Sequence, residues 1–263
     1  MLKFIKKDDQ KIAYKVTGKG FPVVFIHGFC EDGRMWDDFS KKFSDYQVIT
    51  IDLPGFGQTD LIPELTISKM ADTVKAVLDK CKISSCVLVG HSMGGYVAMD
   101  FVSRFSKEID FKGIVMFHSH PFKDSKIKKS KRTQVSNFIE KNGVAIFVHQ
   151  FLPSLFSGFF NSNRFTVQKL TFRASQYSKE SLLASLNAMR NRIDHTKTME
   201  QIDCPVLFIN GMKDEIIPVE LALEQTALPN IADIRNLEDV GHVGMFEAPN
   251  RTSRFIREFL ARL

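Results

Sequence analysis

The feature that most constrains this 263-residue chain is a serine between a strand-like run and a helix-like run. The apolar run Val87-Leu88-Val89 leads into Gly90-His91-Ser92-Met93-Gly94, and a helical pattern follows. In a strand–turn–helix, Gly-x-Ser-x-Gly places the serine on a sharp turn with its hydroxyl clear of the backbone. Gly90 and Gly94 must be small because strand and helix approach closely there. A serine hydroxyl is a weak nucleophile at neutral pH, so Ser92 would need a base and an acid from elsewhere.

The best candidate for the base is His242, in the segment Asp239-Val240-Gly241-His242. This segment follows the last strand-like run and precedes a C-terminal helical pattern. An H-x-H pair at positions 118 and 120 suggests a metal site, but no third ligand stands at a recognisable spacing, so we expect no metal. The other histidines are expected to pack at strand ends or to lie in the middle segment. The six competitors are His27, His91, His118, His120, His149 and His195.

The best candidate for the acid is Asp214, which follows the strand-like run that ends at Asn210-Gly211. Its carboxylate would accept the imidazole N–H, fix the tautomer and stabilise the imidazolium. Glu215 is the nearest rival, and Asp124 is a further substitute. The chain order Ser92, Asp214, His242 is the order that accompanies this serine motif in one group of hydrolases.

These motifs resemble the α/β-hydrolase fold family, in the large group with an inserted lid, over nearly the whole chain. The run ending in His27-Gly28-Phe29 is similar to the family's third strand and H-G turn, and residues 52–57 (DLPGFG) are similar to its D-x-P-G-x-G loop. The resemblance implies that the backbone N–H groups of Phe29 and Met93 form an oxyanion hole. A single glycine follows His27, where many lipases carry H-G-G-G.

Strand-like and helix-like runs alternate along the chain, which predicts an α/β fold with a mostly parallel, eight-stranded sheet flanked by helices. Residues 2–17 are expected to form a β-hairpin. Further strands are expected near 21–27, 47–52, 84–90, 112–118, 204–210 and 231–237. Helices are expected near 34–43, 66–81, 94–105, 217–227 and 246–262.

Between residues 119 and 203 the alternation stops, and a helical segment rich in phenylalanine follows. A long structureless loop is unusual in a compact domain, so this segment is expected to be a helical lid inserted into a core of residues 1–118 and 204–263. Most of its aromatic side chains should form its own interior. They are Phe138, Phe147, Phe151, Phe156, Phe159, Phe160, Phe165 and Phe172. The residues expected to line the substrate pocket are His27, Trp36, Phe147, Phe151 and Val243.

The expected lid also holds the positive charge of the chain. From Pro121 to Lys197 there are 14 Lys and Arg against 4 Asp and Glu, a net charge of +10 in a chain of +6. A solvated helix face is the default interpretation, and steering of an anionic substrate or an acidic partner is the alternative. Nucleic acid is not expected, since no recognition motif accompanies the cluster. Its densest part is Lys123, Lys126, Lys128, Lys129, Lys131 and Arg132.

The rest of the sequence bounds the setting of this chemistry. The N-terminus lacks an apolar signal core, and no run is long enough to span a bilayer, so we expect a cytoplasmic protein without membrane insertion. The four cysteines show neither a disulfide framework nor zinc spacing, which favours reduced thiols. No dinucleotide fingerprint or P-loop is present, and no cofactor is expected. A monomer or a homodimer is compatible with the sequence.

The motifs together predict a carboxylesterase-like serine hydrolase that acts on a small acyl ester through an acyl-enzyme. The bond itself stays open among carboxylic ester, thioester, lactone and a carbon–carbon bond next to a carbonyl. A narrower alternative follows from the H-G-F turn, Met35-Trp36 and the basic lid, which resemble the pimeloyl methyl ester esterases. Members of that group act on acyl chains held by an acidic carrier protein. An alternative of another class is a ligand-binding or scaffold protein of this fold that does not turn over.

Overall fold

An eight-stranded sheet, in the order β1-β2-β4-β3-β5-β6-β7-β8, organises the fold. The computed structural model of the chain describes residues 1–158 and 164–263. β1 pairs antiparallel with β2, and β2 antiparallel with β4, while every other neighbouring pair is parallel. The predicted mostly parallel sheet is therefore confirmed. The strands are β1 (Leu2–Lys7), β2 (Gln10–Thr17), β3 (Pro22–Ile26), β4 (Gln47–Ile51), β5 (Ser85–His91), β6 (Asp110–Phe117), β7 (Val206–Gly211) and β8 (Ala232–Leu237).

The central strands are apolar along nearly their whole length because both faces of the sheet are covered. β5 lies between β3 and β6, and from Cys86 to His91 all of its residues are buried. The helices outside the β6–β7 connection pack around this sheet, with α1 against α2 and α10 against β7. These elements are α1 (Ile67–Lys80), α2 (Met93–Phe105), α8 (Val219–Glu224), η4 (Gln225–Ala227), α9 (Gly244–Glu247) and α10 (Pro249–Leu260).

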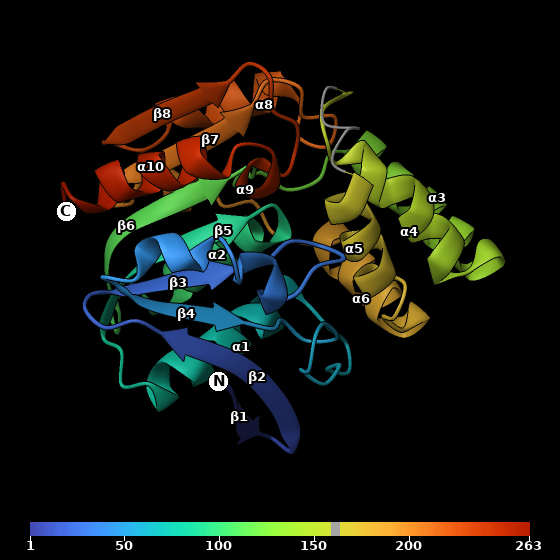
Figure 1. Cartoon of the computed structure of the whole chain (residues 1–263), viewed down its shortest axis with the longest axis horizontal. Coiled ribbons are helices and arrows are strands. Elements are labelled where there is room, and N and C mark those ends of the chain that lie inside the picture. Colours follow the sequence, from blue (N-terminus) through green and yellow to red (C-terminus); the bar gives the residue numbers. More distant parts are fainter. Residues whose placement is uncertain (159–163) are drawn as a thin grey trace.

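Among the described residues between β6 and β7, where the sequence predicted a helical insertion, five α-helices are present. Figure 1 shows α3 to α6 grouped to one side of the sheet, on the side toward which β3 and β4 point. We call the segment between β6 and β7 the helical insertion. Its helices are α3 (Lys126–Asn142), α4 (Val144–Ser154), α5 (Arg164–Ala174), α6 (Lys179–Arg190) and α7 (Thr196–Glu200). The predicted aromatic residues Phe159 and Phe160 lie outside the described residues.

Two predicted helices take a different form. The expected helix over 34–43 is two 3₁₀-helices, η1 (Gly33–Trp36) and η2 (Ser40–Phe43). The side chain of Asp32 accepts the Arg34 N–H, while the Gly33 N–H donates to Asp52, so the first turn is held by side chains rather than by an α-helical ladder. The expected helix over 246–262 begins instead at Pro249. Proline favours the first position of a helix, because it has no backbone N–H to donate to a preceding turn.

One buried cluster fastens the helical insertion to the sheet. The Tyr177 hydroxyl, which follows α5, donates a 2.5 Å hydrogen bond to Asp32, and the Tyr177 ring packs edge-on against Phe56. Arg34 forms an ion pair with the same carboxylate. Burial by itself would raise the pKa of Asp32, but the hydrogen bonds from Arg34 and Tyr177 lower it to about 2. Asp32 is therefore a charged anchor for the insertion.

Tyr177→Phe should destabilise the protein, since it removes the donor and leaves a buried carboxylate oxygen without that bond. The loss of unfolding free energy should be about 1–3 kcal/mol at pH 7, measured by urea denaturation. Tyr46→Phe is the control, since the Tyr46 hydroxyl makes no hydrogen bond within the described ranges. Because the folded pKa of Asp32 is lowered, its stabilisation is complete above the usual value and fades as pH falls from about 4 towards 2. Equal stability of both variants at pH 7 would contradict the anchor.

Candidate active site

Ser92 occupies the turn between β5 and α2, in a strained backbone conformation. Its φ of 51° and ψ of −115° lie in a region that L-residues rarely adopt. A Cβ at Gly90 would lie 2.6 Å from the carbonyl oxygen of Gly94, and one at Gly94 would run into the backbone of Ile26. Gly90 therefore allows β5 to approach the start of α2, and Gly94 allows α2 to approach the end of β3. Both close approaches surround the turn that holds Ser92, as the sequence predicted for small residues here.

The structure brings the side chains of Ser92, His242 and Asp214 together in one hydrogen-bonded chain. The Oγ atom of Ser92 lies 2.8 Å from Nε2 of His242, and Nδ1 of His242 lies 2.7 Å from Oδ2 of Asp214. All three residues are buried. They come from the end of β5, the loop after β8 and the loop after β7, so the fold assembles residues that lie up to 150 positions apart.

The surroundings of Asp214 keep it as a carboxylate. Its second oxygen accepts the backbone N–H groups of Ile216 at 2.8 Å and Ile217 at 2.9 Å. Burial by itself would raise the pKa of Asp214, but the charge and hydrogen bond of His242 lower it below its usual value. A carboxylate here accepts a hydrogen bond from Nδ1–H of His242, which leaves the unprotonated Nε2 free to accept the Ser92 hydroxyl proton.

The two rival acids are placed differently. Glu215 is exposed and makes no contact with His242 within the part of the chain that the structure describes. Asp124 is buried but is taken up by two guanidinium groups, those of Arg132 and of Arg192, the latter at 2.6 Å. Only Asp214 therefore has the geometry to orient the imidazole.

The two predicted oxyanion donors come from different segments, the start of α2 and the turn after β3. Met93 is the first residue of α2, so its N–H has no acceptor within the helix. Phe29 follows β3 in the H-G turn, and its side chain lines the same cavity as Ser92. The two backbone N–H groups are thus candidates for holding a developing negative charge, a role that remains a proposal.

Glu31 and His91 connect the Phe29 turn to the His242 loop, and the sequence reasoning missed this link. Glu31 accepts the Gly28 N–H at 3.1 Å and the His91 Nδ1–H at 3.0 Å, while Nε2 of His91 donates to the His242 carbonyl at 2.9 Å. Burial by itself would lower the pKa of His91, but the charge of Glu31 raises it overall. The signal in the sequence was a carboxylate three residues after Gly28.

Glu247 fixes the loop of His242 from the other side. Its Oε1 accepts the N–H of Gly241 at 2.9 Å, and its Oε2 accepts the N–H of Ser157 at 2.8 Å. The backbone N–H of His242 donates to the carbonyl of Leu155 in the helical insertion, at 2.8 Å. The position of His242 therefore depends on both α9 and the insertion, and sequence patterns gave no sign of Glu247.

Ser92 and His242 open into an apolar cavity of about 250 Å³ beneath the helical insertion. The predicted pocket residues Phe147 and Phe151 are part of its lining. The lining also holds three basic side chains that the pocket prediction lacked. The cavity is lined by Phe29, His91, Ser92, Tyr96, Lys128, Lys131, Arg132, Val135, Phe147, Phe151, Leu155, Leu186, Met189, Ile216 and His242.

The expectation that His27, Trp36 and Val243 line the pocket was wrong. His27 is fully buried, and its Nε2 accepts the backbone N–H of Leu53 at 2.9 Å, so it joins two loops instead. Trp36 is fully buried and packs on Phe25 with ring centroids 5.1 Å apart. Val243 is also without exposed surface. All three serve the interior of the core beside the site.

Comparison with known proteins identifies the family of this fold. A sequence profile described as alpha/beta hydrolase fold matches residues 22–249. The chain belongs to the α/β-hydrolase fold family.

Relatives of this α/β-hydrolase carry several activities in their names. A non-heme chloroperoxidase, CPO-A1, of Kitasatospora aureofaciens is 28% identical over 97% of this chain and 96% of its own. The pimeloyl-[acyl-carrier protein] methyl ester esterase of Wigglesworthia glossinidia brevipalpis is 26% identical over 95% and 97%. A thermophilic esterase of Thermogutta terrifontis, solved with malate bound, superposes with a TM-score of 0.91 at 27% identity, covering 100% of this chain and 98% of that one.

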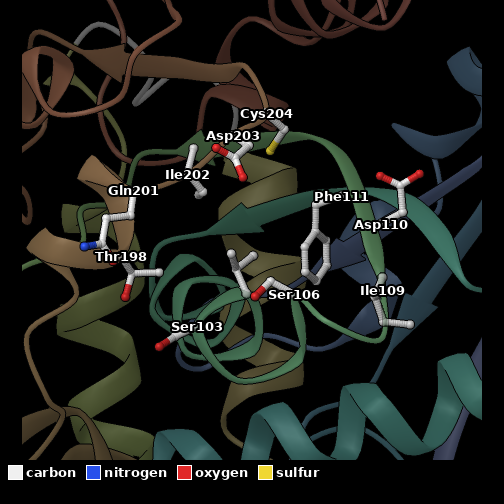
Figure 2. A pocket seen from close by; sticks show the side chains of 11 residues that line it. Ser103, Ser106, Ile109, Asp110, Phe111, Thr198, Gln201, Ile202, Asp203 and Cys204 are labelled. Atoms are coloured by element: carbon white, nitrogen blue, oxygen red, sulfur yellow. The ribbon is translucent and has the colours of Figure 1, made fainter.

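A second cavity of this α/β-hydrolase, of about 300 Å³, lies at the far end of α2 (Figure 2). Its lining comes from the end of α2, the start of β6 and the segment before β7. Ser92 precedes the first turn of this 13-residue helix, so the length of α2, about 20 Å, separates Ser92 from the second cavity. The cavity is lined by Val102, Ser103, Ser106, Ile109, Asp110, Phe111, Thr198, Gln201, Ile202, Asp203 and Cys204.

The described ranges contain no group of three or more His, Cys, Asp or Glu side chains arranged to hold a metal ion. His118 and His120, the H-x-H pair, face different surroundings. Nε2 of His118 accepts the Gly244 N–H at 3.1 Å, and Nδ1 of His120 accepts the Phe122 N–H at 3.2 Å. Burial lowers the pKa of both, that of His120 to about 3.

In the described ranges of the chain, no helix has the length and apolar character that crossing a bilayer requires.

Proposed function

We propose that this chain is a serine hydrolase that cleaves a carboxylic ester through an acyl-enzyme, with Ser92 as nucleophile, His242 as base and Asp214 as orienting acid. The observation that carries the proposal is the hydrogen-bonded chain from Asp214 through His242 to Ser92, at the floor of an apolar cavity. In this proposal the helical insertion, residues 119–203, is the lid, and residues 1–118 and 204–263 are the catalytic core.

The proposed reaction starts when Nε2 of His242 takes the hydroxyl proton as Ser92 attacks the ester carbonyl. The carbonyl oxygen becomes an oxyanion, which the N–H groups of Phe29 and Met93 stabilise. The tetrahedral intermediate collapses, and His242 gives its proton to the departing alkoxide, leaving an acyl group on Ser92. Water, deprotonated by His242, then attacks the acyl carbon. The second tetrahedral intermediate collapses as His242 returns the proton to the Ser92 oxygen, which releases the carboxylic acid and restores the enzyme. Asp214 stabilises the imidazolium in both halves.

A second candidate is hydrolysis of an acyl chain that is attached to an acidic carrier protein. It is favoured by the relative named as a pimeloyl-[acyl-carrier protein] methyl ester esterase and by the basic face of α3. The same three residues would carry the chemistry, so the two candidates differ in substrate rather than in mechanism. A ligand-binding protein that does not turn over is the remaining alternative.

Ser92→Ala should abolish hydrolysis of 4-nitrophenyl acetate and butyrate, because it removes the nucleophile. Loss of a triad nucleophile costs on the order of 10⁶ in turnover. The matched control is Ser103→Ala, at an exposed position of α2, the helix that begins directly after Ser92. This variant should keep wild-type rates. Thermal unfolding of both variants should remain close to wild type. Substantial turnover by the Ser92 variant would place the nucleophile elsewhere, and no turnover by the wild type would favour the binding protein.

Asp214→Asn should lower turnover by about 10⁴, because an amide can no longer fix the imidazole tautomer or stabilise the imidazolium. Glu215→Gln, one residue further along the same loop, is the control and should remain active. Both rates would be measured with the same nitrophenyl esters. The assignment of the acid would be overturned if the Glu215 variant were inactive and the Asp214 variant retained its rate.

A further inference from the structure

One wall of the Ser92 cavity is basic. Lys128, Lys131 and Arg132 of α3 all line it, and Val135 continues the same face one turn later. The spacing of three and four residues places their side chains on one side of a helix. The described lining residues include no carboxylate, so the charge of this wall is not balanced within the cavity.

The three basic groups are not equivalent. The guanidinium of Arg132 is paired with Asp124, through Nε and, at 3.3 Å, through Nη2. Asp124 also binds Arg192, so a single carboxylate faces two guanidinium groups. Burial and repulsion from Arg132 lower the pKa of Lys128 more than the attraction of Asp124 raises it. Neither Lys128 nor Lys131 forms an ion pair with a carboxylate of the described residues.

Lys128 is the more constrained of the two lysines. Its ammonium is half-buried and donates to the carbonyl oxygen of Ile216 at 3.1 Å, in the loop that follows Asp214. Burial lowers the pKa of Lys128, and repulsion from Arg132 lowers it further. A cation withdrawn from water gains from an anionic partner in direct contact, and no carboxylate among the described residues forms an ion pair with Lys128. A ligand can supply that partner.

We propose that Lys128 and Lys131 form a subsite for a carboxylate of the substrate, so that the preferred ester carries a free carboxylate remote from the bond cleaved at Ser92. The inference rests on the proposed function and adds the substrate class. Apart from His91, Tyr96 and the catalytic candidates, the rest of the lining is apolar, from Phe29, Phe147 and Phe151 to Leu186 and Met189. It suits a hydrocarbon chain between the scissile carbonyl and the distal charge. A lysine ammonium acts as a point charge, whereas the guanidinium fork of Arg132 is already occupied.

The test compares anionic esters with neutral isosteres. The first pair is the mono-4-nitrophenyl ester of adipic acid and the same ester with its free carboxylate replaced by a neutral amide. Mono-4-nitrophenyl esters of dicarboxylic acids of four to eight carbons extend the series. The second pair, 4-acetoxybenzoate and 4-acetoxybenzamide, places the charge on the alcohol side. We expect the anionic member of one pair to have the higher kcat/KM, by about tenfold or more, and the pair that responds tells which side of the ester carries the carboxylate.

Lys128→Met should lower this ratio about tenfold, the loss of one charge-assisted hydrogen bond at a half-buried position. Lys131→Met should lower it less, because Lys131 is exposed and water screens its charge. Lys128→Arg should retain more of the ratio than Lys128→Met. Lys126→Met and Lys129→Met, on the same helix but outside the lining, are matched controls and should keep the wild-type ratio. The ratio is informative because a purely structural role of Lys128, through Ile216, would affect both members of a pair alike.

A ratio near one in the wild type, with normal turnover of neutral esters, would overturn the subsite and leave the proposed function standing. Equal losses in the control variants would point to the general field of α3 and would also overturn it. The subsite would likewise be overturned if the lysine variants changed kcat/KM only for acyl chains linked to a carrier protein. Failure of the proposed function is distinguishable, since no ester in either pair would then be hydrolysed.

Discussion

The close approach of β5 to α2 is the constraint on which the rest of the site depends. Neither Gly90 nor Gly94 has room for a side chain, and because both residues are so small the chain can turn within one residue at Ser92. The strained φ of that residue is maintained by the buried parallel strands on both sides of β5. Once the serine stands at this edge of the sheet, the loops after β7 and β8 reach it directly, because the ends of parallel strands lie together.

Buried charge is arranged so that each loop around Ser92 is fixed by a different carboxylate. Glu31 holds the Phe29 turn to His91, Asp214 holds the His242 ring, and Glu247 holds the His242 backbone. A buried carboxylate is stable only where hydrogen bonds replace water, and each of these accepts backbone or imidazole N–H groups. Oε1 of Glu31 is the exception, a buried oxygen without a hydrogen-bond partner in the described residues. The lysines of the α3 wall differ from these carboxylates, since neither forms an ion pair within that part of the chain.

The sequence predicted the strands, the helical insertion and the three residues that the hydrogen-bonded chain joins. These features carry strong local signals, such as the apolar runs before Ser92 and Asp214 and the turn residues around His242. The pocket was predicted poorly. The spacing of apolar residues along the sequence indicates that Trp36 and Phe147 are both buried, but it does not indicate which of them faces a cavity. The links from Glu31 to His91, from Glu247 to Ser157 and from Lys128 to Ile216 could not be read from the sequence either, because these partners lie 60 to 90 positions away along the chain.

The most direct test of the central claim is to react the protein with a fluorophosphonate and to locate the adduct by mass spectrometry of the intact chain and of its peptides. A fluorophosphonate phosphonylates a serine whose hydroxyl proton a neighbouring base removes, and it releases fluoride. The account predicts a single adduct on the peptide that contains Ser92, absent from Ser92→Ala and strongly slowed in His242→Ala. An adduct on another residue, or none on a folded and otherwise intact chain, would contradict the claim that Ser92 is an activated nucleophile.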